Sequence, residues 1–165
     1  MKQIKRLTII GLLLLSTGLY AQRANQWGFG IQLGDPTGLT VKKFMGSNNA
    51  LNFNIGNSYF GELRIGADYL WHFDAFRSDV VKMHAGFGGV LGFGDGNSAF
   101  YDDGPDNFYR RGDDDAGIAV RGIVGIDIYP RTSPFEIFLE FGPLIGLAPE
   151  TGSAVDVAVG FRFYP

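Results

Sequence analysis

The segment from residue 153 to residue 164 alternates between two kinds of side chain, and this alternation constrains the fold more than any other feature. One set is apolar and becomes aromatic towards the C-terminus: Val155, Val157, Val159, Phe161 and Phe163. The other set consists of small and charged residues, among them Asp156 and Arg162. A period of two residues places the two sets on opposite faces of a β-strand. The pattern therefore predicts a strand with one wholly apolar face.

Seven other segments alternate in the same way, and none shows a sustained helical repeat. In chain order the expected strands are Trp27–Leu33, Thr37–Phe44, Ala50–Asn57, Glu62–Phe73, Val81–Phe93, Ala116–Tyr129, Phe135–Pro143 and Ser153–Tyr164. Segments rich in Gly, Pro, Asp, Asn and Ser separate them, as turns require. We therefore expect an all-β fold, an eight-stranded antiparallel barrel.

The N-terminus predicts export. Lys2, Lys5 and Arg6 precede an apolar core at 7–15, and Ala21 ends a short region of mostly small residues, as in a secretory signal peptide. The alternative, an uncleaved membrane anchor, is disfavoured because the apolar run is shorter than the ~20 residues of a spanning helix. We expect residues 1–21 to be removed and 22–165 to form one domain. Their removal changes the formal charge from −3 to −6, since three cations and no acids are lost.

Composition excludes several classes of function. The acidic balance argues against a nucleic-acid partner. The chain has no cysteine, so it can form neither a disulfide framework nor a thiolate metal site. A chain without a long apolar helix beyond its signal can span a membrane only as a closed barrel, because only helices and barrels satisfy the backbone in lipid.

The apolar face is expected to point outwards, into lipid. Its side chains are too bulky for the interior of an eight-stranded barrel. The opposite face is rich in glycine, which would leave the backbone exposed if that face were the outer surface of a soluble barrel. Aromatic side chains also gather near one end, as in a membrane-interface girdle. They are Trp27, Phe29, Phe44, Tyr69, Trp71, Phe73, Tyr129, Phe135, Phe161 and Phe163. Phe44 and Tyr129 break the parity of their strands, so the alternative for these two is a place in a turn. The alternative is a soluble, lipocalin-like barrel with the apolar face inside.

Several segments resemble a widespread family of small, uncharacterised outer-membrane β-barrel proteins of Gram-negative bacteria. Gly34-Asp35-Pro36-Thr37-Gly38-Leu39-Thr40 resembles its G-x-P-T-G-L-[ST] motif, and Asp68-Tyr69-Leu70-Trp71-His72 and Phe135-Glu136-Ile137-Phe138-Leu139-Glu140 also match. More broadly, the chain is similar to the membrane domain of outer membrane protein A. The resemblance implies a bacterial outer-membrane location with both termini in the periplasm, and assembly by the barrel-assembly machinery. Such chains usually end in an aromatic residue, whereas this one ends in Pro165.

Charged residues and histidines occupy the face opposite the apolar one, and we expect them to form an ion-pair network that plugs the lumen. The candidates are Lys42, Glu62, Arg64, Asp68, His72, Lys82, His84, Arg121, Asp127, Glu136, Glu140, Asp156 and Arg162. Cations and acids nearly balance, and buried charges need partners. The alternative is a narrow ion or water pore.

A lipid A-modifying enzyme is the second alternative function. His72 and His84 face inwards on neighbouring strands, and a Ser–His–acid arrangement would be needed for acyl chemistry. No serine stands beside either histidine in the pattern. We therefore expect no catalytic residues and no cofactor.

The longest connection, residues 94–115, is expected outside the cell. Its aromatic residues Phe100, Tyr101, Phe108 and Tyr109 are candidates for contact with an extracellular protein or ligand. Its acids Asp102, Asp103 and Asp106 suit Ca²⁺ in kind, but their spacing does not match an EF-hand loop, so no metal is expected. The chain as a whole predicts an outer-membrane barrel with a structural or surface-interaction role and with membrane lipids and lipopolysaccharide as partners.

Overall fold

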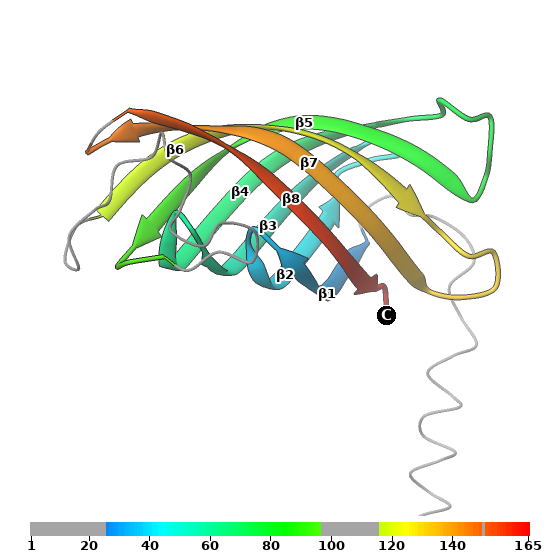
Figure 1. Cartoon of the computed structure of the whole chain (residues 1–165). Coiled ribbons are helices and arrows are strands. Elements are labelled where there is room, and N and C mark those ends of the chain that lie inside the picture. The colour runs from blue at the N-terminus through cyan, green and yellow to red at the C-terminus, as the bar shows by residue number, and fades with distance from the viewer. Residues whose placement is uncertain (1–25, 97–115, 150) are drawn as a thin grey trace, which may run out of the picture.

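The structure, a computed structural model, describes residues 26–96, 116–149 and 151–165. Eight antiparallel strands close into a barrel in chain order, with β8 hydrogen-bonded to β1 (Figure 1). The strands are β1 (Trp27–Gly34), β2 (Thr37–Phe44), β3 (Asn49–Ser58), β4 (Gly61–Phe73), β5 (Val81–Phe93), β6 (Ala116–Ile128), β7 (Phe135–Ala148) and β8 (Gly152–Phe163). The predicted eight-stranded antiparallel barrel is confirmed. Within the described residues, no helix has the length and apolar character needed to cross a membrane.

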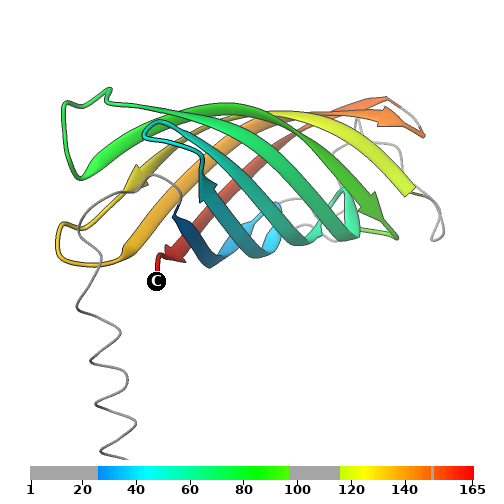
Figure 2. The same ribbon diagram turned by 180° about the vertical axis from the view of Figure 1, so that it is seen from behind.

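The barrel has two distinct ends. At the termini end, β1 begins, β8 ends, and residues 45–48, 74–80 and 129–134 connect strands. At the opposite end, called the loop end here, residues 35–36 and 59–60 connect strands, β5 and β7 end, and β6 and β8 begin. Strands β1 and β2 have 8 residues each, whereas β4, β5 and β6 have 13 and β7 has 14. The wall is therefore low beside the first strands and tall on the other side (Figures 1 and 2).

Strand β7 is longer than the alternation predicted. The expected strand stopped at Pro143, but β7 continues to Ala148. Pro143 stays in register with Val155 of β8, while no partner on β6 is recorded for it. Proline lacks a backbone N–H, so it cannot donate a hydrogen bond to a neighbouring strand and interrupts the ladder on one side. Beyond it, Leu144 points inwards and Ile145 outwards, which continues the strand.

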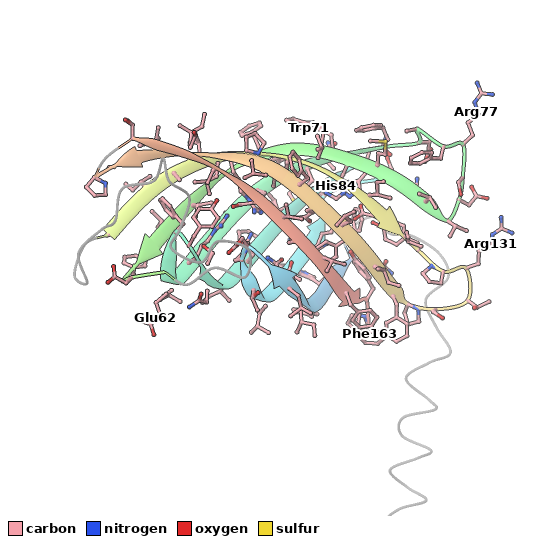
Figure 3. All side chains as sticks on the ribbon, in the orientation of Figure 1. Glu62, Trp71, Arg77, His84, Arg131 and Phe163 are labelled. Atoms are coloured by element: carbon pink, nitrogen blue, oxygen red, sulfur yellow. The ribbon has the colours of Figure 1, made fainter. Side chains whose placement is uncertain are left out.

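Burial is inverted relative to a soluble protein. Large apolar side chains cover the exterior, for example Leu33 and Phe87 with 61% and 62% of their surface exposed, whereas most charged side chains of the strands are buried (Figure 3). The predicted face assignment therefore holds for the strands as a whole. The closed sheet leaves no edge, and each inward position alternates with an outward one.

Two clusters of buried apolar side chains, called the apolar layers here, lie inside the barrel. The layer at the termini end consists of Phe44, Ala50, Leu70, Ile123, Tyr129 and Tyr164. The layer towards the loop end consists of Phe60, Val90, Ala119 and Leu144, with Tyr59 packed against it. The expectation that Phe44 and Tyr129 belong to the outer girdle was wrong. Each lies two residues after an inward side chain, Lys42 or Asp127, and so shares its direction.

Candidate functional site

Most of the predicted polar network lies buried between the two apolar layers. The buried members are Lys42, Arg64, Asp68, His72, His84, Arg121, Asp127, Glu136, Glu140, Asp156 and Arg162. They come from β2 and from β4 to β8, so the closure of the barrel, rather than any local segment, brings them together. They comprise five acids, four lysines or arginines, and both histidines of the chain.

Two predicted members lie elsewhere. Glu62 is exposed at the start of β4, where its side chain projects from the loop end (Figure 3). Lys82 lies at the other end, half-buried, and its Nζ pairs with Asp74 Oδ1 at 3.0 Å. Both share the inward parity of their strands, but they are next to a strand terminus, where a long side chain can reach solvent. Their assignment to the interior was therefore wrong.

The cluster nearer the loop end alternates cations and anions. Arg64 Nη1 donates to Asp156 Oδ1 at 3.1 Å, and its Nη2 also pairs with this carboxylate. Arg121 Nη1 reaches Asp156 at 3.3 Å, while its Nε and Nη2 form a forked pair with Asp68 at 2.8 and 2.5 Å. Such forked guanidinium–carboxylate pairs are strong and geometrically specific. Tyr59 donates its hydroxyl hydrogen to Asp156 and closes the cluster.

The cluster nearer the termini end is centred on Glu136 and Asp127. Lys42 Nζ donates to Asp127 Oδ2 at 3.0 Å and to Glu136 Oε1 at 3.2 Å. Arg162 Nη1 donates to Glu136 at 2.5 Å, and Nη2 to Glu140 at 3.3 Å. Tyr164 donates its hydroxyl hydrogen to the other oxygen of Glu136. This cluster thus contains three carboxylates, one lysine and one arginine.

Asn52 joins the two clusters. Its side-chain oxygen accepts from Arg162 Nη2 at 3.0 Å and from Thr40 at 3.1 Å, while its nitrogen donates to Asp68 at 3.2 Å. Sequence reasoning did not include Asn52, Thr40, Tyr59 or Tyr164 in the network. The inward parity of Thr40 and Asn52 was a usable signal, whereas nothing local indicated that Tyr59, in a connection, would turn inwards.

Both histidines converge on Asp127. His72 and His84 lie opposite each other on β4 and β5, with ring centroids 5.5 Å apart. His84 Nδ1 lies 3.0 Å and His72 Nε2 3.1 Å from Asp127 Oδ2. Gly125 makes room for this arrangement, because a Cβ there would stand 2.4 Å from His84 Nε2.

Two tyrosines outside the strands have altered acidity. Burial raises the pKa of the Tyr59 hydroxyl, and the carboxylate of Asp156 raises it further. Burial likewise raises the pKa of Tyr164, with Glu136 adding to the effect. Both therefore stay protonated as hydrogen-bond donors.

The remaining predicted sites, Phe100, Tyr101, Phe108, Tyr109 and the acids Asp102, Asp103 and Asp106, lie outside the described residues. No family model matches the chain, and no curated protein matches it either.

Proposed function

We propose that the chain is a bacterial outer-membrane β-barrel with a structural or surface-interaction role and a lumen sealed by its own side chains. The observation that carries the proposal is the inverted burial: Arg64, Arg162 and Lys42 are wholly buried, while Phe29 and Ile31 are 50% and 56% exposed. Water would penalise such an exterior, whereas acyl chains would not. The periplasmic position of both termini belongs to the same proposal, as does membership of the family that the motifs resemble.

An aromatic cluster at the termini end supports the membrane location. On the exterior, Phe135 packs against Phe161 and Phe163 with ring centroids 4.8 and 5.4 Å apart. Around the barrel, Trp71 lies 4.8 Å from Tyr69 and 5.7 Å from Phe87. Interfacial aromatic girdles have this composition and position. Lipids, lipopolysaccharide and the barrel-assembly machinery are the partners that the proposal implies.

Cell fractionation tests the location. Expressed with its own export signal in a Gram-negative host, the protein should sediment with the outer membrane, resist extraction by carbonate, and migrate differently on SDS gels before and after boiling. A soluble periplasmic protein treated in parallel gives the control. Recovery of folded protein in a detergent-free aqueous extract would contradict the proposal.

The two apolar layers favour a sealed lumen over the pore alternative. Phe60 is buried towards the loop end and Phe44 at the termini end, with paired charges between them. In planar bilayers we expect no unitary conductance steps, while a general porin reconstituted in the same way gives them. Reproducible steps from the purified protein would show an open path.

The enzyme alternative receives no support from the surroundings of the histidines. Among the described residues, His72 contacts the Asn48 carbonyl and Asp127, and His84 contacts Asp127 and Glu140. These contacts include no serine or threonine hydroxyl that either histidine could activate. The geometry favours a structural or interactive role.

A further inference from the structure

The only two histidines of the chain lie next to the same aspartate, Asp127, in the interior of the barrel. His72 Nδ1 lies 3.2 Å from the backbone oxygen of Asn48, and its other nitrogen, Nε2, faces Asp127. His84 Nε2 lies 3.8 Å from Glu140 Oε1, and its Nδ1 faces Asp127. The outer nitrogen of His72 is within hydrogen-bond distance of an oxygen, whereas that of His84 is not, because 3.8 Å is too long for a hydrogen bond. The inner nitrogens point at the same carboxylate oxygen.

The position of the Asn48 carbonyl bears on where the ring proton of His72 lies. An oxygen acceptor behind a histidine favours the tautomer that carries its proton on that side. The inner nitrogens of His72 and His84 lie 3.1 and 3.0 Å from Asp127 Oδ2. Each ring can donate a hydrogen bond to this carboxylate, or, as the other tautomer, offer its inner nitrogen to a cation placed between them. A histidine that ligates a metal ion commonly gives its outer N–H to a carboxylate or backbone oxygen, as His72 can give its own to Asn48.

We propose that His72, His84 and Asp127 form a binding site for a divalent first-row transition metal, with Zn²⁺ as the representative ion. Imidazole and carboxylate together suit this class of ion. One ligand atom from each residue lies within 4.8 Å of the other two. Ligands held at ~2.1 Å from one zinc ion stand about 3–3.5 Å apart. The two distances from Asp127 Oδ2 to the histidine nitrogens, 3.1 and 3.0 Å, already fall in this range.

The local charge balance favours an added cation. The surrounding cluster holds three carboxylates, Asp127, Glu136 and Glu140, against the two cations Lys42 and Arg162. Among the buried atoms of the described residues, Asp127 Oδ1 has no hydrogen-bond partner. A bound cation would neutralise the carboxylate of Asp127, and Lys42 would remain paired with Glu136, whose Oε1 is 3.2 Å from its Nζ.

Metal content and cobalt spectroscopy test the site directly. The full chain, expressed with its export signal and without an affinity tag, is purified in metal-free detergent and equilibrated with Zn²⁺. We expect about one zinc ion per chain, and Co²⁺ in its place should give the visible absorption bands of a low-coordinate nitrogen and oxygen site. This spectrum needs no altered protein, so it decides the question even if a variant fails to fold.

Variants then assign the ligands. His84→Gln should weaken zinc binding by at least about 100-fold. Glu62→Gln removes an exposed carboxylate at the far end and should leave the affinity unchanged. Substoichiometric zinc without cobalt bands would overturn the proposal. Zinc binding that persists unchanged in His84→Gln would overturn it as well.

Discussion

Glu136 and Arg162 face each other across the β7–β8 ladder, and both side chains are wholly buried. They are register partners, and Arg162 Nη1 donates to Glu136 Oε1 at 2.5 Å. The Arg162 guanidinium also stacks over the Phe138 ring, with its carbon 3.6 Å from the ring centroid. Gly160, the partner of Phe138 on β8, leaves the space that this ring fills. Pairing, stacking and space thus come from adjacent inward positions of two strands.

Breaking this pair should destabilise the barrel strongly. Arg162→Met leaves Glu136 and Glu140 without their guanidinium in the interior, and an uncompensated buried charge costs about 3–5 kcal/mol. Urea unfolding in lipid vesicles measures the free energy of unfolding. The control is Lys82→Met, which removes a partly exposed pair with Asp74 and should cost less than ~1 kcal/mol. Equal losses in the two variants would contradict the account.

Glycine is required where a ring approaches the sheet from inside. Gly125→Ala would place a Cβ 2.4 Å from His84 Nε2 and 2.7 Å from the backbone oxygen of Leu139. Overpacking of this kind costs about 1–3 kcal/mol of unfolding free energy. Gly89→Ala is the matched control, because nothing lies within 4 Å of its added Cβ. The first variant should lower the urea midpoint and the second should not; the reverse order would refute this packing.

Tyr59 should resist ionisation in the folded state. Burial and the neighbouring Asp156 raise the pKa of its hydroxyl above that of an unfolded tyrosine, about 10. A pKa raised by folding stabilises the protein below pH ~10, and this contribution is lost as pH rises through the folded pKa. The phenolate absorbance of the folded protein at pH ~11 should therefore lack the contribution of Tyr59, and unfolding at the same pH should add that contribution.

Tyr59→Phe provides the control for that titration. It should remove one late-titrating phenol and make the loss of stability at high pH less steep. If the folded wild type reached its full phenolate absorbance by pH ~11, the buried position of Tyr59 would be wrong.

A charge on the exterior should be costly only within the lipid-facing band. Val124 lies outwards in the middle of β6 and is 49% exposed. Val124→Arg should cost about 2–4 kcal/mol in vesicles, as expected near a bilayer midplane. Phe76→Arg, in the β4–β5 connection and 53% exposed, should change stability by no more than ~0.5 kcal/mol. A soluble barrel would tolerate both substitutions, so equal tolerance would argue against a membrane.

Strand positions could be predicted because alternation is a local signal. β2 and β5 begin and end where the sequence indicated. The expected strand ended at Pro143, although the alternation continues to Leu147 and β7 extends to Ala148. Interior and exterior could be told apart because an apolar exterior and a glycine-rich interior suit only one arrangement.

Partners inside the barrel could not be predicted, because they depend on how far each strand is staggered when the sheet closes. Lys42 on β2 meets Asp127 on β6 and Glu136 on β7 across the lumen, which no sequence spacing reveals. The position of a residue along its strand matters equally. Glu62 and Lys82 have inward parity but stand at strand ends, where their charges reach solvent or an exposed partner.

The two tryptophans of the chain test the central claim on the unaltered protein. Trp27 and Trp71 both point outwards at the termini end, and each is 43% exposed (Figure 3 labels Trp71). When the protein is reconstituted in vesicles, nitroxide-labelled lipids should quench the tryptophan fluorescence, most strongly when the label lies near the headgroups. Iodide in the aqueous phase should quench this fluorescence little. Strong quenching by iodide with none by labelled lipids would contradict a lipid-facing exterior.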